Sequence, residues 1–352
     1  MEQKGVTIKD IADDLKVSLT TVHKVIYNKK GVSEQTRQRV LNYIQESGYH
    51  VNRAASALKR RPLHLAYVGL SPSEANGFFF QRLSDGIREA YESVKSFNVE
   101  MDFLVESQDA DQQCELLEKL YDERRDSMDG LLLCCSHENR CTPLIRKFTS
   151  SGIPVVTVSS DAKNSTRSSY VGPDNVTVGR VAAEMITDLG IPANGQILLV
   201  SGYREFSNHQ TVSTAFADYM AGERPDAEIC DIYQSRSLLS TEKRIRNYLK
   251  AFPGISSAYS VTASGTYALC RAVQEEQMTG KIKVVGTDVF EELRPFFRDR
   301  VISATLFQDP YRQALTATNA LYNIVSRELS VPEEQYINIS LAVRSNFDDF
   351  LK

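Results

Sequence analysis

The sequence of 352 residues lacks any continuous run of about eighteen apolar residues, the length that a membrane-spanning helix requires. Its first ten residues, MEQKGVTIKD, lack the apolar stretch of a secretory signal peptide. These two absences exclude the common routes into and across a membrane. We therefore expect a cytoplasmic protein with no membrane partner.

The six cysteines lack the spacing of a disulfide framework, and no CxxC pair occurs. Two of them are adjacent within one apolar run, and the others are scattered along the chain. A metal site is conceivable where thiols and an imidazole gather, at Cys134, Cys135, His137 and Cys141. We prefer reduced thiols in a protein that holds no metal and no cofactor.

Enzyme motifs are also missing. The sequence contains no GxSxG, no GxxxxGK[ST] and no GxGxxG after an apolar run, and its five histidines fall in no triad-like or metal-like spacing. Asp161 and Asp288 could be imagined as a glycosidase pair. We instead interpret them as carboxylates that bind hydroxyl groups, and we predict no catalytic residue.

Charge is distributed unevenly along the chain. Residues 1–62 contain twelve Lys or Arg and six Asp or Glu, whereas the whole chain has a net charge of −4. A basic N-terminal region on an acidic body is typical of a protein whose one end meets a polyanion. A solvated basic face is the alternative explanation.

Residues 7–48 predict three short helices. Thr7 and Asp10 suit a capping box ahead of a first amphipathic helix, and Ser18 and Ser33 can cap the second and third. Only two residues separate the first two periodic segments, which is the arrangement of a helix-turn-helix unit. The second helix of such a unit enters the major groove of DNA.

The predicted DNA contacts gather on the second helix and at the helix starts. Leu19, Thr20 and Lys24 point away from its apolar face and suit base edges. Polar side chains and free N–H groups at a helix start suit phosphate oxygens. The alternative for Leu19 is an isolated surface leucine. The candidates in residues 1–50 are Thr7, Ser18, Leu19, Thr20, Thr21, Lys24 and Asn28.

The motifs VTIxDIA, VSxxTV, VSxxTRxRV and GYxxNxxAxxL cover almost the whole N-terminal region. This pattern resembles the DNA-binding head of the lactose-repressor (LacI) family of bacterial transcription regulators. There are departures: Lys16 stands where the family usually has a turn glycine, His23 and Lys24 replace a common Ser-Arg pair, and Tyr27 is atypical. A lysine reads guanine less rigidly than an arginine, so no family operator can be carried over.

Residues 51–62 resemble the hinge helix of that family. The resemblance implies that the segment folds on operator DNA when two subunits bind, and that Leu58 wedges into the central base step of the minor groove. Such a short, Ala-rich segment is marginal alone, and its basic residues suit phosphate. The alternative is a plain linker helix with Leu58 packed on the body. The candidate contacts are Asn52, Leu58, Lys59, Arg60 and Arg61.

Short apolar runs alternate with amphipathic segments from His64 onward, as in HLAYVGL, GLLLCC, QILLVSG and KVVGTD. Strand–helix repetition over roughly 280 residues predicts parallel sheets covered on both faces. This length exceeds one doubly wound domain, and the polar stretch from Asp161 to Asp174 suggests two halves. Ligands bind in such folds outside the carboxyl ends of the strands.

The body resembles the type I periplasmic sugar-binding-protein fold, most closely its ribose-binding branch. The resemblance implies three crossings between two subdomains, which we place near Asp161, Asp288 and Gln308. The predicted N-subdomain is then about 63–161 and 289–308, and the C-subdomain about 162–288 and 309–352. The expected fold class is an all-α head and hinge helix followed by this α/β body.

Candidate effector ligands lie at the ends of the predicted strands. Aromatic rings there can stack on a sugar ring, and carboxylates or amides can bind its hydroxyl groups. A helix N-cap is the alternative for each aspartate, and the core is the alternative for the phenylalanines. The candidates are Phe78, Phe79, Phe80, Asp161, Arg204, Ser264, Asp288 and Gln308.

Two departures from the ribose-binding pattern concern the ligand. Val212 stands where an arginine is usual, and Ser264 replaces an asparagine; Arg204, His209 or Gln210 could substitute from the nearby loop. A polyol, a sugar acid or another metabolite is therefore open beside a neutral sugar. The sequence as a whole predicts a homodimeric repressor of operator DNA with a small-molecule effector. The rival classes are a solute-binding protein, an enzyme and a DNA-bending protein.

Overall fold

The computed structural model describes residues 6–26, 31–47, 61–73, 76–327 and 329–351, with the side chains of 45 and 46 left out. Five predicted DNA contacts lie outside the described residues, namely Asn28, Asn52, Leu58, Lys59 and Arg60, and so do most of the predicted hinge helix and Tyr27.

The head consists of three helices, α1 (Ile8–Leu15), α2 (Leu19–Ile26) and α3 (Glu34–Ser47). Thr7 and Asp10 form the predicted capping box, and the Oγ atoms of Ser18 and Ser33 accept hydrogen bonds from the backbone N–H groups of residues 21 and 36. The helices enclose a small core of Ile11, Ala12, Val22, Val25 and Val40.

The turn between α1 and α2 has the geometry that a glycine adopts most easily. Lys16 has φ 52° and ψ 45°, in the left-handed region, and its N–H group closes α1 by donating to the carbonyls of residues 12 and 13. A glycine would adopt this left-handed conformation without a steric cost, which explains why the family usually has a glycine here. Lys16 forms the same turn at a cost in backbone strain.

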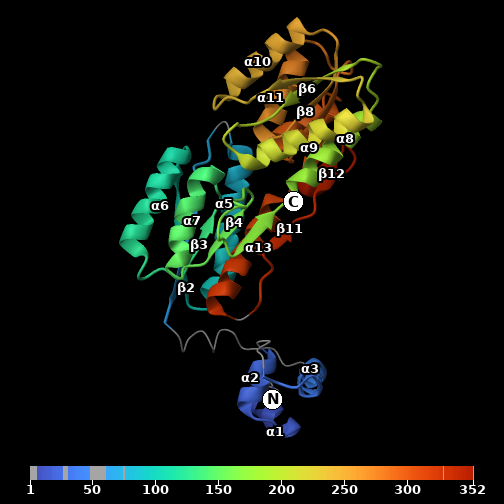
Figure 1. The fold of residues 1–352 in the computed structure, drawn as a ribbon. Coiled ribbons are helices and arrows are strands. Elements are labelled where there is room, and N and C mark those ends of the chain that lie inside the picture. Colours follow the sequence, from blue (N-terminus) through green and yellow to red (C-terminus); the bar gives the residue numbers. More distant parts are fainter. Residues whose placement is uncertain (1–5, 27–30, 48–60, 74–75, 328, 352) are drawn as a thin grey trace.

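The first lobe of the body is a parallel sheet with helices on both faces (Figure 1). Its strands, in spatial order, are β11 (Glu334–Tyr336), β5 (Ser169–Gly172), β4 (Val155–Val158), β3 (Gly130–Leu133), β1 (Leu63–Leu70) and β2 (Val99–Ser107). Its helices are α5 (Gly77–Lys95), α6 (Ala110–Arg124), α7 (Glu138–Ser150) and α13 (Pro310–Ser326). Helices α5 and α13 bury one face of the sheet, and α6 and α7 bury the other.

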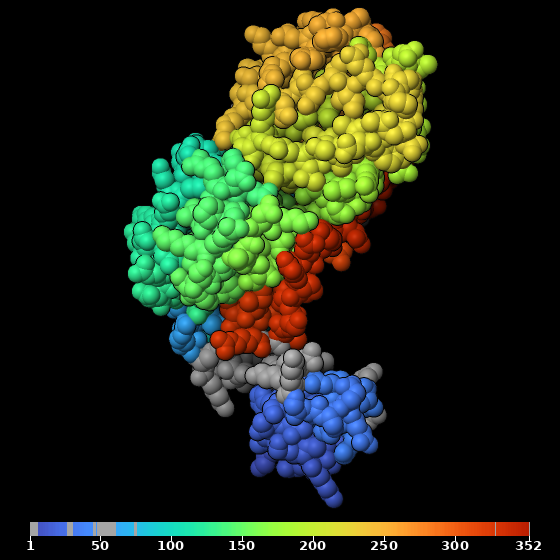
Figure 2. Space-filling model, viewed as in Figure 1, coloured from blue at the N-terminus to red at the C-terminus, as the bar shows by residue number. Residues whose placement is uncertain are grey.

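The second lobe repeats this plan. Its strands, in spatial order, are β12 (Ser340–Ala342), β10 (Ala304–Phe307), β9 (Lys283–Thr287), β8 (Ile255–Ser260), β6 (Gln196–Val200) and β7 (Glu228–Ile232). Only β12 runs antiparallel to its neighbour. The covering helices are α8 (Asn175–Asp188), α9 (Ser207–Glu223), α10 (Leu238–Ala251), α11 (Ala263–Glu275) and α12 (Arg294–Arg298), with 3₁₀ turns at Glu291–Leu293 and Phe347–Phe350. The two lobes meet along one seam (Figure 2).

The chain passes between the lobes three times, and the structure corrects two of the three predicted positions. The crossing predicted near Gln308 is confirmed, because β10 belongs to the second sheet and α13 packs on the first. The first crossing follows Gly172, not Asp161, because β5 still pairs with β4. The crossing near Asp288 is wrong, because β9 pairs directly with β10.

The remaining crossing joins β11 to β12, between Tyr336 and Ser340. The predicted subdomain ranges change accordingly. The first lobe comprises residues 63–172 and 310–336, and the second comprises residues 175–307 and 340–351. The predicted fold class of a helical head and a doubly wound two-lobed body is confirmed.

Candidate functional site

The carboxyl ends of strands from both lobes face one cavity, which encloses about 600 Å³ of space, part of it open to solvent. Ligands bind preferentially at such places, between domains and outside the carboxyl ends of the strands of α/β sheets. Five predicted effector residues line it: Phe79, Phe80, Ser264, Asp288 and Gln308. The sequence-based placement of ligands at strand ends therefore brought most of the candidates to one place.

Asp288 is the most buried charged side chain of the cavity, at 4% exposure. It follows β9 with φ 65°, a left-handed conformation that Asp tolerates better than most residues. One carboxylate oxygen accepts a hydrogen bond from the backbone N–H of Gln308, at 3.1 Å. Burial nevertheless raises the pKa of Asp288 to about 7, against the opposing effect of that hydrogen bond.

Unusual backbone angles recur around the cavity. Ser159, which follows β4, has φ 65°, and Asp309, at the start of α13, has φ 53°. Ser159 and Asp288 thus line the cavity in the left-handed region directly after their strands, whereas Asp309 lies at the crossing from the second lobe to the first. Such strained positions cluster at functional sites, and their occurrence here supports a ligand-binding role.

Aromatic side chains from both lobes form one wall. Phe79 and Phe80 belong to the first turn of α5, and Tyr203 and Phe206 come from the loop before α9. The rings of Phe80 and Phe206 lie 6.4 Å apart, so the two lobes touch through this wall. Phe78 does not line the cavity but stacks on Phe290 at 4.2 Å and packs against the core of the second lobe.

A hydrogen-bonded network in the second lobe supports the polar part of the cavity. The amide nitrogen of Gln234 donates to the hydroxyl oxygens of Ser264, at 2.6 Å, and Tyr203, at 3.0 Å. The hydroxyl of Thr262 donates to the amide oxygen of Gln234, at 2.5 Å. Sequence reasoning missed Gln234, although it follows a predicted strand end as the other candidates do.

His209 is a cavity residue whose protonation can be assigned from its partner. Its Nδ1 atom accepts a hydrogen bond from the backbone N–H of Tyr203, so the proton of the neutral ring is on Nε2. Removal from solvent lowers the pKa of His209 to about 4, which keeps the ring neutral at physiological pH. His209 thus contributes a neutral donor to the cavity.

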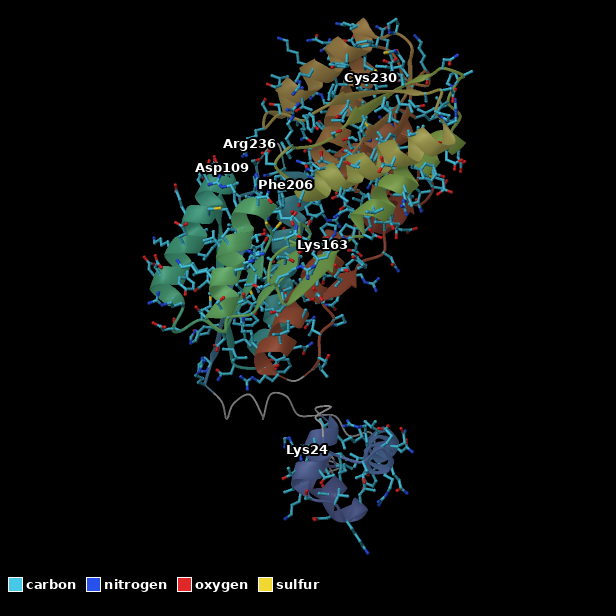
Figure 3. All side chains as sticks on the ribbon, in the orientation of Figure 1. Lys24, Asp109, Lys163, Phe206, Cys230 and Arg236 are labelled. Carbon is cyan, nitrogen blue, oxygen red and sulfur yellow. The ribbon has the colours of Figure 1, made fainter. Side chains whose placement is uncertain are left out.

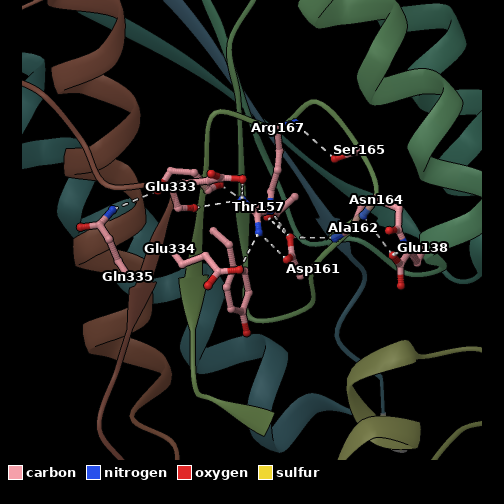
Figure 4. A network of polar contacts seen from close by, with 12 residues as sticks. Glu138, Thr157, Asp161, Ala162, Asn164, Ser165, Arg167, Glu333, Glu334 and Gln335 are labelled. Carbon is pink, nitrogen blue, oxygen red and sulfur yellow. Dashed lines mark hydrogen bonds and ion pairs between the residues drawn. The ribbon is translucent and has the colours of Figure 1, made fainter. Parts of the chain in front are cut away.

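Besides Phe78, two more predicted effector residues, Asp161 and Arg204, do not line this cavity. Asp161 lies in a separate surface hollow, and its carboxylate accepts hydrogen bonds from Arg167 at 2.5 and 2.8 Å and from Thr157 at 2.7 Å (Figure 4). Arg204 lies over the ring of Tyr233, 4.1 Å from its centre. The position that is arginine in the ribose-binding pattern, Val212, does line the cavity.

Arg167 connects Asp161 to the last crossing between the lobes. Its side chain is 2% exposed, and its third hydrogen bond goes to the backbone carbonyl of Glu333, at 2.9 Å, just before β11 (Figure 4). The pair therefore fastens the loop after β4 to strand β11. This is a structural role for Asp161 that its position at a strand end did not reveal.

An outer part of the cleft opens beside the aromatic wall, where Asp109, Phe206 and Arg236 lie close together (Figure 3). Arg236, from the second lobe, donates to the carbonyl of Gln108 in the first lobe at 2.7 Å and pairs with Glu205 at 2.8 Å. This contact spans the two lobes at the mouth of the cleft.

The candidate DNA contacts of the head lie at the start of α2 and on its outer face. Leu19 is 49% exposed, Thr20 is exposed, and Thr21 and Lys24 are half-buried. Ser18 and Thr7 are both engaged in helix capping, so the donors that the starts of α1 and α2 offer to phosphate are backbone N–H groups of the first turn. Arg61, predicted to hold phosphate, instead pairs with Asp129 of the first lobe at 2.6 and 2.9 Å.

All six cysteines are buried with free thiols. Within the described ranges, no three His, Cys, Asp or Glu side chains are placed to hold a metal ion. The helices of those same ranges include none that is long and apolar enough to cross a membrane.

Comparisons with known proteins match both parts of the chain. A family model described as "Periplasmic binding protein domain" matches residues 68–329, and one described as "Bacterial regulatory proteins, lacI family" matches residues 7–52. The ribose import binding protein RbsB of Bacillus subtilis is 24% identical over 274 residues, which cover 75% of this chain and 85% of RbsB.

The HTH-type transcriptional regulator DegA of Bacillus subtilis is 28% identical over 186 residues, and the match spans about half of each protein, 52%. A glucose-galactose binding protein from Geobacillus stearothermophilus, GanP, has the same fold, with a TM-score of 0.73 at 21% identity over 82% of this chain and 99% of GanP. The chain belongs to the periplasmic binding protein domain family, and it carries at its N-terminus the DNA-binding head of the bacterial lacI-family regulatory proteins.

Proposed function

We propose that this protein is a cytoplasmic transcription regulator that acts as a homodimer, binds a pseudo-palindromic operator in double-stranded DNA and represses transcription, with its operator affinity controlled by a small effector of the sugar class. One observation carries the proposal: a single chain joins an exposed helix-turn-helix surface to a two-lobed domain with a buried ligand cavity. The names of the relatives, a regulator and a ribose-binding protein, support the same two roles. The proposal includes no catalytic step.

The head would read DNA through α2. Leu19, Thr20 and Lys24 would face base edges in the major groove, and the starts of α1 and α2, with Thr7, Ser18 and Thr21, would contact phosphates. Two heads in a dimer would read two half-sites related by the two-fold axis of the protein. On the sequence alone, Asn28, Asn52, Leu58 and Lys59 complete the proposed DNA surface.

The effector would act by changing how the lobes sit on one another. Phe79 and Phe80 from the first lobe and Asp288 and Ser264 from the second would hold one ligand, with Gln308 at the crossing between them. Arg61, which lies two residues before β1, is bound to Asp129 of the first lobe, so a movement of that lobe is passed to the chain that leads to the head. Such coupling is typically worth about 1–3 kcal/mol.

A DNA-binding measurement tests the proposal. Full-length protein and its Lys24→Ala variant would be titrated, at moderate salt, against DNA from upstream of its own gene and against random DNA of equal length. We expect a complex that prefers the upstream DNA, a preference that Lys24→Ala reduces and that the exposed control Lys119→Ala in α6 leaves intact. Equal affinity for both DNAs would refute the regulator assignment.

A further inference from the structure

The charges around the effector cavity are of one sign. Among the described residues that line it, Asp288 is the only carboxylate, and none is lysine or arginine. The ring of His209 is neutral, because its pKa is lowered to about 4. A ligand that fills this cavity therefore meets one carboxyl group that can carry a negative charge, and no positive charge.

Arg82, the cation that acts electrostatically on Asp288, forms its hydrogen bonds elsewhere. The guanidinium of Arg82, on α5, donates instead to the backbone carbonyls of Val289, at 2.8 Å, and Phe350, at 3.4 Å. The other ionisable groups that act on Asp288 are Asp309, at the start of α13, and the phenol of Tyr259, on β8. Arg82 lowers the pKa of Asp288, but burial outweighs it.

The cavity also has hydrogen-bond acceptors that lack donors. The carboxylate of Asp288 receives one hydrogen bond from the described part of the chain, from the N–H of Gln308. Asn208, another lining residue, has a buried side-chain oxygen to which no described residue donates. A buried acceptor without a donor is costly, so the side-chain oxygen of Asn208 calls for a donor that a ligand brings, and the Asp288 carboxylate has lone pairs left for a second donor.

The aromatic wall is compatible with the same kind of ligand. The rings of Phe79, Phe80 and Phe206 line the cavity beside Asp288, and the face of an aromatic ring attracts a cation as well as the C–H face of a sugar ring. An anionic ligand, by contrast, would be brought next to a buried carboxylate without any basic side chain to balance it.

We propose that the effector is a single-ring compound with a protonated amino group, of the amino-sugar class, and that Asp288 is the residue that binds its ammonium group. The inference rests on the proposed role of this cavity as the effector site. It narrows the effector class from neutral sugars, sugar acids and polyols to ring amines. The ammonium group would donate to Asp288 and Asn208, while the ring would lie against the phenylalanines.

A matched ligand series tests the charge preference. Full-length protein would be melted at pH 7 with D-glucosamine, D-galactosamine or D-mannosamine, each compared with its parent hexose and its uronic acid. We expect at least one amino sugar to bind about ten-fold or more tightly than its neutral parent, and no uronic acid to bind. No shift from any amino sugar, or equal binding of a neutral or acidic counterpart, would overturn the proposal.

The variant Asp288→Asn identifies the residue responsible. Asparagine tolerates the left-handed backbone and keeps the acceptor for the N–H of Gln308, so the fold should be preserved. We expect the preference for the amino sugar to fall to less than three-fold, whereas the exposed control Glu292→Gln keeps it. An unchanged preference in Asp288→Asn would overturn the assignment of Asp288.

Melting of the protein without ligand tests whether the carboxylate of Asp288 lacks a positive charge to compensate it. The pKa of Asp288 in the folded protein, about 7, lies above its ordinary value, so its burial destabilises the fold increasingly between pH 4 and pH 7 and fully above pH 7. Asp288→Asn should therefore raise the melting temperature at pH 8 by more than it does at pH 5. A lower melting temperature at pH 8 would mean a balanced carboxylate and would overturn the proposal.

These outcomes are separable from the proposed function. Binding of a neutral sugar, together with operator binding that this sugar alters, would refute the amino-sugar proposal and leave the regulator assignment standing. Loss of the preference for upstream DNA would refute the regulator assignment, whatever the cavity binds.

Discussion

Replacement of Arg167 by methionine should lower the free energy of unfolding of the body by about 3 kcal/mol. The guanidinium is 2% exposed and makes two hydrogen bonds to Asp161 and one to the carbonyl of Glu333. Removal of one partner from a buried ion pair costs about 3–5 kcal/mol, because the other charge is left without compensation. Asp161 is itself 16% exposed and keeps its hydrogen bond from Thr157, so we expect the lower end, about 3 kcal/mol.

Urea and thermal unfolding at pH 7, followed by circular dichroism, would measure this loss. A decrease of about 3 kcal/mol corresponds to a fall in melting temperature of about 6 °C. The double variant Asp161→Asn/Arg167→Met removes both charges and should recover most of the loss. Arg124→Met is the matched surface control, since Arg124 and Asp102 form a pair whose side chains are half exposed, and we expect a change below about 1 kcal/mol there.

The reasoning would be refuted in either of two ways. If Arg167→Met lies within about 1 kcal/mol of the original protein, the pair does not hold β11 in place. If the double variant is as unstable as the single one, the loss comes from packing rather than from an uncompensated carboxylate.

Three further predictions concern other parts of the chain. Lys16→Gly relieves the left-handed strain at φ 52° and should stabilise the head by about 0.5–1 kcal/mol. The control Lys9→Gly, within α1, should instead destabilise the head by about 1 kcal/mol. Hydrogen exchange of the α1 amides measures both changes, and equal effects of the two variants would contradict the role of the turn. Leu58→Ala should weaken binding to operator DNA far more than binding to random DNA, as measured by gel shift, and equal losses would argue against a wedge. Arg236→Gln removes an exposed contact across the cleft and should weaken effector binding by about five-fold or less, without changing operator binding. Calorimetry would measure the affinity for the effector. An unchanged affinity would show that the contact does not hold the cleft closed.

Local patterns in the sequence predicted the elements of the fold more reliably than their connections. The apolar runs such as HLAYVGL and KVVGTD are strands, because a strand buried on both faces is a continuous apolar segment. Strands β5, β11 and β12 escaped notice because they are three or four residues long and, unlike the equally short β3 and β4, contain no continuous apolar run.

The crossings could not be located from such patterns. The segment between β9 and β10 has the same strand–helix–strand order as any other, and only the pairing of β9 with β10 shows that the chain stays in one lobe. The crossing after β11 was missed for a related reason, because the two short strands on either side of it were not predicted.

The candidate site residues also fall into two groups, those whose place follows from a strand and those whose place follows from a loop. Asp288 and Gln308 lie where predicted because each directly follows a central strand of the second sheet, whose carboxyl end faces the cavity. Asp161 also follows a strand, but Arg167 folds back from six residues later and takes its carboxylate. That pairing depends on the path of a loop, which strand and helix periodicity does not describe. His209 and Gln234 act through hydrogen bonds to neighbours, and spacing alone does not reveal such partners.

The three crossings have a consequence for how the protein is made on the ribosome. Helix α13 and strand β11, which complete the first lobe, come from residues 310–336, and β12, which completes the second, comes from residues 340–342. Neither lobe can therefore complete its sheet until nearly the whole chain has been synthesised. Contacts so distant in sequence form slowly, and until then the apolar surface around Leu83 and Ile87 that α13 covers stays exposed. We therefore expect the nascent chain of this protein to bind chaperones that cover apolar surface during translation.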